Sequence, residues 1–173
     1  MEDLSLHILD IAENSVRAKA KRVEIRVIED LENDLLSIEI QDDGLGMDEE
    51  ATKRAVDPFF TTKAKRIGLG LSLLAQATKE AEGEFRIDSK KDIGTRVQAI
   101  FKHSHIDRKP LGNMAETLIV LILGNPEVEF FYCHKKADLT YSLDTCKIRA
   151  KFSNTQDMLK AIKEELYQVA FKR

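Results

Sequence analysis

The sequence predicts a two-layer α/β sandwich, of the α+β class, in which helices cover one mixed and mostly antiparallel sheet. Two amphipathic helices support this prediction. Apolar side chains recur at helical spacing over residues 3–19 and again over 69–82, just before Gly83, a residue type that often ends a helix. Between them, Asp48 is placed to cap a short helix that runs through Ala55.

Four short segments predict the strands of the other layer. Residues 23–27 and 37–40 alternate polar and apolar side chains on either side of an acidic connection, which indicates a hairpin. Residues 84–89 and 95–101 flank a polar turn and indicate a second hairpin. Helices packed on two hairpins give the predicted sandwich.

A second, smaller unit follows. We expect a first domain over 1–105, a polar linker over 106–112 and a small α-β-β-α domain of unknown role over 113–173. The elements expected in this second unit are a helix over 113–123, strands over 128–134 and 139–152, and a helix over 155–170 capped by Asn154.

Composition and charge argue against several classes of function. The net charge of −3 arises from 27 basic and 30 acidic side chains spread along 173 residues, without the basic stripe that is typical of nucleic-acid binding. The longest apolar run, 118–123, is far shorter than a membrane span and indicates a core element. The N-terminus has acids where a secretory signal has bases, and the two cysteines lack CxxC spacing. We therefore expect a cytoplasmic protein that binds neither nucleic acid nor membrane.

Asp10 and Asn14 lie four residues apart on the first predicted helix and so share one face. An amide oxygen is a suitable ligand for Mg²⁺, which binds few protein groups besides phosphates and water. A neighbouring carboxylate could orient or deprotonate an attacking water. The alternative is that the pair is the polar face of a surface helix.

The segment Asp42-Asp43-Gly44-Leu45-Gly46-Met47 directly follows an apolar strand. Its glycines permit tight turns and close approach of the backbone to a ligand. A carboxylate there suits the amine of a base such as adenine and disfavours a phosphate, although an ordinary Asp-Gly turn explains the same residues.

A phosphate-binding pattern comes next. Asp57-Pro58-Phe59-Phe60-Thr61-Thr62-Lys63 places hydroxyls and a mobile positive charge before Gly68-Leu69-Gly70, where a helix begins. Backbone amides at a glycine-rich helix N-terminus favour anionic phosphate. Gly94-Thr95, at the start of the last strand of the first domain, adds a hydroxyl.

In this order and spacing the segments resemble the gyrase, heat-shock chaperone, histidine kinase and MutL (GHKL) superfamily. The stretch HILDIAENSVRAKA is similar to its N-box, DDGLGM to its first glycine box, and DPFFTTK to the phenylalanine box and the start of the ATP lid. GLGLSLL is similar to its second glycine box, and IGTRVQAIF to its closing Gly-Thr strand. The resemblance implies a histidine-kinase-like, Bergerat-type fold that holds Mg·ATP over the sheet.

Carried over by position, the resemblance implies Asn14 as the Mg²⁺ ligand, Asp42 and Thr95 as adenine-side contacts, and Lys63 as a phosphate contact. The complete set of implied nucleotide contacts is Asn14, Asp42, Gly44, Gly46, Met47, Phe60, Thr61, Lys63, Gly68, Leu69, Gly70 and Thr95.

Asp10 falls where gyrase-like and MutL-like members have the catalytic glutamate, and it is one methylene shorter. Arg17 and Arg66 also depart from patterns within the superfamily. We expect no histidine-bearing hairpin before the domain, and this expectation disfavours self-phosphorylation.

Three functions remain open. We expect an Mg·ATP-binding regulatory protein with slow or no hydrolysis that acts on a partner protein and can form a homodimer. The alternative is an active ATPase, or a serine or histidine protein kinase related to the anti-sigma-factor kinases. A structural role without nucleotide would require every motif to be accidental.

Overall fold

The computed structural model describes residues 3–56, 69–152 and 154–170. Six strands and six helices alternate along this part of the chain. They are α1 (Leu4–Arg17), β1 (Arg22–Asp30), β2 (Leu35–Asp42), α2 (Glu49–Arg54), α3 (Leu69–Glu80), β3 (Glu84–Lys90), β4 (Gly94–Lys102), α4 (Met114–Gly124), β5 (Glu129–Lys136), β6 (Leu139–Asp144), α5 (Thr145–Arg149) and α6 (Thr155–Ala170).

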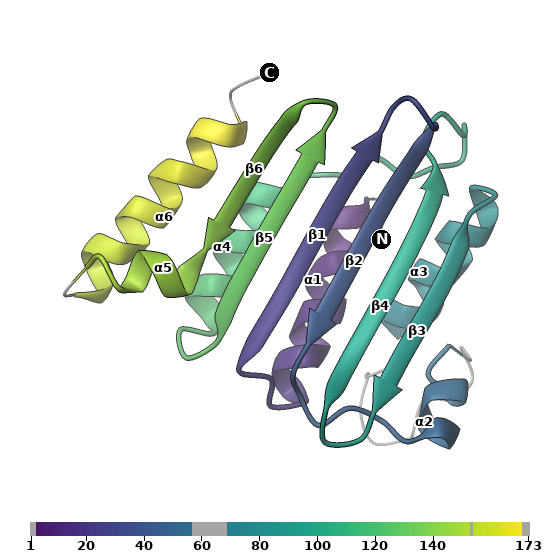
Figure 1. Cartoon of the computed structure of the whole chain (residues 1–173), viewed down its shortest axis with the longest axis horizontal. Helices are drawn as coiled ribbons and strands as arrows, with labels where there is room; N and C mark the ends of the chain where they lie inside the picture. Colours follow the sequence, from purple (N-terminus) through teal and green to yellow (C-terminus); the bar gives the residue numbers. More distant parts are fainter. Residues whose placement is uncertain (1–2, 57–68, 153, 171–173) are drawn as a thin grey trace.

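All six strands form a single sheet in the order β3-β4-β2-β1-β5-β6 (Figure 1). β1 is antiparallel to β2, β2 to β4, and β4 to β3, whereas β1 and β5 run parallel. The mixed, mostly antiparallel sheet and the α+β class confirm the prediction.

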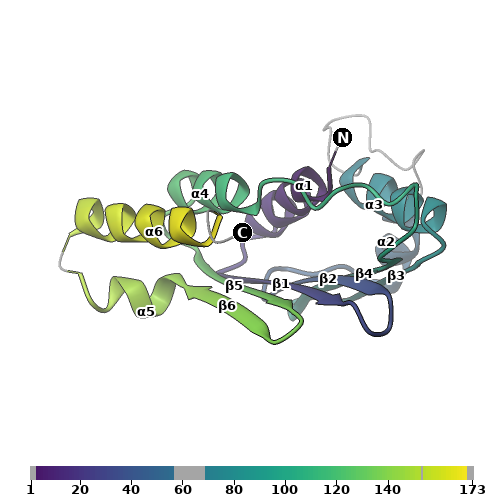
Figure 2. The ribbon, with the colours of Figure 1, turned by 90° about the horizontal axis from the view of Figure 1, so that it is seen from above.

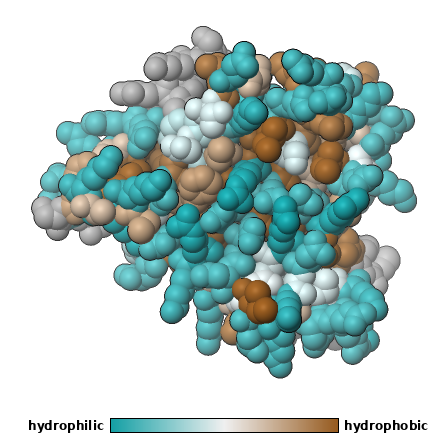
Figure 3. All heavy atoms as spheres, in the orientation of Figure 1, coloured by the Kyte–Doolittle hydropathy of each residue, from teal (hydrophilic) through white to brown (hydrophobic). Residues whose placement is uncertain are grey.

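Helices α1, α3, α4 and α6 lie on one face of this sheet, which gives two layers (Figure 2). Successive side chains along a strand point to opposite faces of the sheet, so every second residue points into the helix layer. On β1 these residues are Val23, Ile25 and Val27, all fully buried. No helix of the described residues covers the other face, which is largely hydrophilic (Figure 3).

Side-chain caps define where several helices begin. Asp3 accepts a hydrogen bond from the backbone N–H of Leu6 at the start of α1, and Asp48 accepts one from Ala51 at the start of α2. Asn154 accepts one from the N–H of Asp157, as expected from the sequence. Each cap satisfies a backbone donor that has no partner within its own helix.

The strand predicted over 139–152 is wrong in its second half. β6 ends at Asp144, whose carboxylate accepts a hydrogen bond from the N–H of Cys146 and caps the short helix α5. The Thr145 hydroxyl accepts a bond from the N–H of Phe130 at 2.8 Å, which fixes this corner against β5. An aspartate that ends a strand and caps the next helix produced the error.

The C-terminal strands extend the sheet of the first hairpins, a contact that the sequence did not indicate. Glu29, near the end of β1, accepts hydrogen bonds from His103 at 3.0 Å and His134 at 2.8 Å and lies 3.4 Å from the Lys136 ammonium. Burial acts to raise the pKa of Glu29, but these partners outweigh it and hold that pKa below its usual value. The carboxylate thus joins β1 to β5 and to the residues that follow β4.

The aromatic run Phe130-Phe131-Tyr132 lies on β5. Phe130 and Tyr132 are buried, but Phe131 lies on the open face beneath the guanidinium groups of Arg22 and Arg26, 5.9 and 5.5 Å from its ring centre. Only alternate members of the run reach the core because side chains in a strand alternate between faces.

His7 is fully buried on α1, and both of its ring nitrogens lack a hydrogen-bond partner within the described part of the chain. Burial, followed by the positive charge of Lys109, lowers the pKa of His7 from 6.5 to about 4. The folded protein therefore holds a neutral imidazole at neutral pH.

We predict that this histidine makes the fold sensitive to acid. Below pH 6.5 the unfolded chain binds a proton at His7 that the folded chain rejects until about pH 4, so stability falls as pH falls through this range. At pH 5 the loss is about 2 kcal/mol. Urea unfolding of wild type and His7→Leu at pH 7.5 and pH 5 measures it. The variant should lose less stability between the two values; an equal loss would show that other groups cause the acid sensitivity.

Candidate functional site

The predicted site residues of the first domain gather at one end of the sheet. Asp42 ends β2, and Thr95, its register partner, is the second residue of β4. α1 runs above these strands and brings Asn14 and Ser15 toward the same end, where α2 also lies (Figures 1 and 2). Segments that are far apart in sequence therefore meet here.

The carboxylate of Asp42 is the centre of this arrangement. Its Oδ2 accepts a hydrogen bond of 2.6 Å from the Ser15 hydroxyl on α1. Its Oδ1 accepts bonds from the N–H of Gly44 at 2.9 Å and from the N–H of Thr95 at 3.3 Å. Three donors from three elements fix the orientation of one half-buried acid.

The glycines beside Asp42 allow its loop to close on neighbouring backbone. Gly46 has φ of +60°, and a Cβ there would lie 2.1 Å from the carbonyl oxygen of Lys90. Gly94 has φ of +134°, and a Cβ there would lie 2.0 Å from the carbonyl oxygen of Asp42. A side chain at either position would be strained and would also clash with backbone. These close approaches join backbone segments of the chain itself, and approach of the glycines to a ligand stays a prediction.

Ser89 is a site residue that the sequence analysis missed. Its hydroxyl lies 2.8 Å from the Thr95 hydroxyl and accepts a hydrogen bond from the N–H of Met47, also at 2.8 Å. It thereby joins the end of β3 to the glycine loop and to β4. A serine within a predicted strand gives no sequence signal for this role.

Asp10 packs against the first turn of α3. A Cβ placed on Gly70 would lie 1.8 Å from Oδ2 of Asp10, so only glycine admits the carboxylate at this distance. Burial is the main cause of a raised pKa at Asp10; Arg17 opposes the shift and Glu13 adds to it. The acid is half-buried and lies near a helix N-terminus, where a negative charge is favoured.

The side-chain carbonyl oxygen of Asn14 already accepts a hydrogen bond. Arg17, one turn further along α1, donates a hydrogen bond of 3.0 Å to Oδ1 of Asn14 and a second of 3.0 Å to Glu13. The oxygen predicted to bind Mg²⁺ thus already faces a positive charge. Arg17 is 49% exposed, so a competing cation can displace it without opening the core.

Four predicted contacts lie outside the described residues: Phe60, Thr61, Lys63 and Gly68. Leu69 begins α3, and the structure describes its backbone but not its side chain. Gly70 is buried in the first turn of that helix. Of the residues predicted to contact phosphate or Mg²⁺, the structure therefore describes only those on α1 and α3.

Residues 2–105 match the family described as histidine kinase-, DNA gyrase B-, and HSP90-like ATPase. The chain belongs to this family. The match spans the whole arrangement around Asp42, so the GHKL-type resemblance seen in the motifs is confirmed.

Several known proteins share this ATPase-type region. Sporulation kinase E of Bacillus subtilis is 38% identical over 68 residues, 39% of this chain and 9% of the kinase. The signal transduction histidine-protein kinase AtoS of Escherichia coli is 36% identical over 88 residues, 50% of this chain and 14% of the kinase. The chain thus corresponds to less than a sixth of the length of either relative.

Solved structures show the same fold. The MutL ATPase domain of Aquifex aeolicus, complexed with ADP, superposes with a TM-score of 0.59 at 19% identity, over 97% of this chain and 70% of that domain. The N-terminal domain of a DNA repair protein superposes with a TM-score of 0.56 at 16% identity, over 83% of this chain and 53% of that structure. At these identities the likeness concerns the fold alone.

Within the described ranges, no three or more His, Cys, Asp or Glu side chains are grouped so that they could hold a metal ion. A Mg²⁺ ion at Asn14 would thus depend on phosphate oxygens and water for its remaining ligands. None of the helices in the described ranges has the length and apolar character needed to cross a membrane.

Proposed function

We propose that this chain binds Mg·ATP between α1, α3 and the Asp42 end of the sheet, and that it acts as an ATP-responsive regulatory protein on a partner protein, with slow or no hydrolysis of its own. The observation on which this rests is the fixed carboxylate of Asp42. Membership of the ATPase-type family supports the nucleotide class.

The carboxylate of Asp42 has capacity for one further donor. An ionised carboxylate offers about four lone-pair sites, and Ser15, Gly44 and Thr95 use three of them. The exocyclic amine of adenine is a donor suited to the fourth. A guanine presents a carbonyl oxygen at the corresponding ring position, and that oxygen would be repelled by the acid.

The phosphates would lie toward α1 and α3. The backbone of α3 at Gly70 approaches α1 closely, and a helix N-terminus favours negative charge. Phosphate oxygens and Asn14 together can hold Mg²⁺, with the ion replacing Arg17 at Oδ1 of Asn14. Contacts from Lys63 and Gly68 remain predictions.

Slow hydrolysis follows from the length of Asp10. The raised pKa of Asp10 is closer to neutral pH than that of an ordinary aspartate, and such a shift suits a general base. A base must also come within hydrogen-bond reach of the attacking water, and an aspartate is shorter than glutamate by one carbon bond. Asp10 is held against Gly70, which restricts its reach further.

The second candidate is an active ATPase, or a protein kinase that phosphorylates serine or histidine. The similarity to sporulation kinase E and AtoS favours transfer of the γ-phosphate over simple binding. Calorimetry with Mg·ATP and a γ-phosphate release assay on the same sample separate the candidates. Binding with slow or no release supports the regulatory protein, rapid release supports the active ATPase, and an absence of binding contradicts both.

We predict that Asn14→Ala weakens Mg·ATP binding at least about tenfold, because the ion loses its protein ligand. Arg17→Ala is the matched variant: it removes the donor from Asn14 and leaves the ligand oxygen in place. This second variant should bind Mg·ATP as well as wild type does, or better when Mg²⁺ is scarce. Calorimetry over a Mg²⁺ series measures both, and equal affinity of wild type and Asn14→Ala would refute the ligand role.

We predict that Asp42→Asn lowers affinity for ATP by more than it lowers affinity for GTP. The amide can present a donor to the adenine amine, and it can no longer accept all three protein hydrogen bonds equally well. Competition binding with both nucleotides gives the two affinities, and thermal melts control for folding. A parallel fall in ATP and GTP affinity would assign Asp42 a structural role only.

We predict that Asp10→Glu raises the rate of ATP hydrolysis, because the added methylene extends the base toward the water. Asp10→Asn should abolish any hydrolysis and preserve ATP binding. Both rates are measured by phosphate release at saturating Mg·ATP. If both variants keep the low rate of wild type, the site is a nucleotide sensor without a functioning base.

A further inference from the structure

Strand β3 forms one outer edge of the sheet (Figure 1). Its seven residues, Glu84–Lys90, pair with β4 in an uninterrupted register and include no proline. On the side of β3 that faces away from β4, no strand of the described residues is paired with it. Regular outer strands present unpaired backbone groups that can accept another strand, and natural proteins usually interrupt them.

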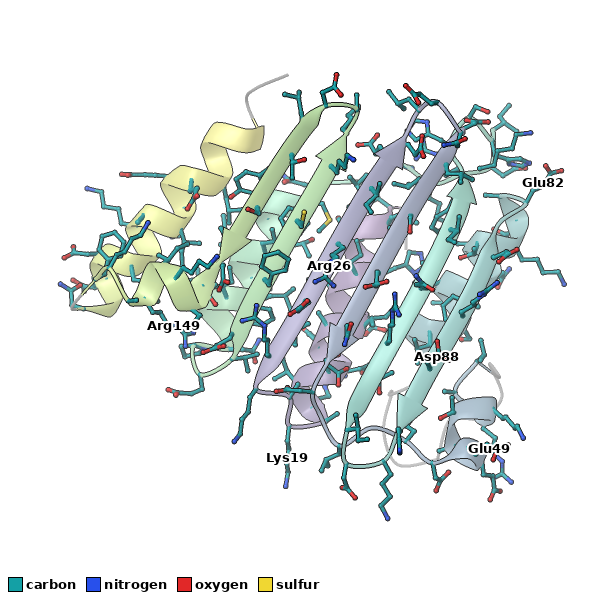
Figure 4. The ribbon with its side chains drawn as sticks, in the orientation of Figure 1. Lys19, Arg26, Glu49, Glu82, Asp88 and Arg149 are labelled. Carbon is teal, nitrogen blue, oxygen red and sulfur yellow. The ribbon has the colours of Figure 1, made fainter. Side chains whose placement is uncertain are left out.

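The charges on β3 alternate in sign. Glu84, Arg86, Asp88 and Lys90 are exposed and point to the open face of the sheet. Asp88 in Figure 4 lies on this face, next to its register partner Arg96. The residues between them point the other way, toward the helices, and Phe85 and Ile87 pack there against the core.

We propose that β3 pairs antiparallel with β3 of a second copy of this chain, around a two-fold axis at Ile87. The two six-stranded sheets then become continuous, with both helix layers on the same side. A two-fold axis makes every contact occur twice, so the strand must be complementary to itself.

The centred register meets this requirement. It places Glu84 opposite Lys90 and Arg86 opposite Asp88, so all four cross-strand pairs on the open face join opposite charges. Ile87 then meets Ile87 of the second copy on the helix side, beside the pairs of Phe85 with Ser89.

Neighbouring registers fail the same test. Moving the second strand by two residues in one direction, which keeps the same side chains on the open face, places Arg86 opposite Arg86 and Glu84 opposite Asp88. Moving it in the other direction places Asp88 opposite Asp88 and Arg86 opposite Lys90. Like charges directly opposite each other destabilise a strand pair, so the sequence of β3 selects one register.

Charges on an outer strand can instead serve to prevent association. That role needs charge but no particular order of signs, and a run of one sign would repel a second copy most strongly. The order in β3 alternates, and within one chain Arg86 already lies 3.0 Å from Glu84. Side chains that are 67% and 65% exposed, as these two are, can turn toward a second strand without loss of core packing.

The surroundings of β3 fix where the two copies would meet. α2 contacts β3 and lies beside the Lys90 end of the strand (Figure 1). In the symmetric pair each α2 therefore flanks the Glu84 end of the other strand. The interface is small, so the association is expected to be weak. The proposal does not depend on nucleotide binding, because the carboxylate of Asp42 lies on β2.

Two single variants and their mixture test the pairing. Arg86→Asp gives a strand with acids at both central positions, and Asp88→Arg gives one with bases at both. Each variant alone sets like charges opposite each other twice, and self-association should weaken at least about tenfold. In an equimolar mixture the acidic strand faces the basic strand, so a heterodimer should form with about the affinity of the wild-type homodimer.

Sedimentation velocity from about 1 to about 200 μM, a range suited to a weak interface, measures the association. One chain labelled with a fluorophore identifies the heterodimer. Lys147→Asp, an exposed position on α5 at the other end of the sheet, has the same charge change as Arg86→Asp and should dimerise like wild type. A monomeric wild type throughout this range, dimers of either single variant at wild-type strength, or a mixture that stays monomeric would each overturn the proposal.

Discussion

The carboxylate of Asp42 is the interaction on which the site depends. It holds the hydroxyl of Ser15 from α1, the backbone of the glycine loop and the backbone of Thr95 in β4 in one place. Without it, the N–H groups of Gly44 and Thr95 would lose this acceptor, and the Ser15 hydroxyl would keep only its longer bond of 3.3 Å to the carbonyl of Ile11. Buried donors without partners cost free energy. The same acid is the proposed recognition group for adenine, so structural and binding roles coincide at one side chain.

The sheet gives this acid a rigid frame. β1 lies at its centre, antiparallel to β2 on one side and parallel to β5 on the other, and its inward side chains form the floor under α1. The bond from Ser15 to Asp42 can form only because α1 packs on this floor at a fixed height. Glu29 and its histidines hold the far end of the same strand. The C-terminal residues thereby stabilise the strand whose hairpin partner, β2, ends at the site.

Local patterns predicted most of the elements because their determinants are local. Asp3, Asp48 and Asn154 accept hydrogen bonds from residues three positions ahead, so a cap is visible in a short window of sequence. The exception is the strand that ends at Asp144. That acid caps α5 directly after β6, and alternating residues on both sides concealed the boundary. Site chemistry was visible in the same way, through Asp10, Asn14 and the glycines that follow Asp42.

The sequence alone determined the fold class, the family and the residue types of the site, because periodicity, caps and motif spacing act over a few residues. Tertiary structure decided which of these groups meet. No local pattern encodes the pairing of β1 with β5 or the hydrogen bonds of Ser89 with Thr95 and Met47. The burial of His7 likewise depends on elements that are distant in sequence. Such contacts depend on how whole elements pack, and packing is settled only when the chain has folded.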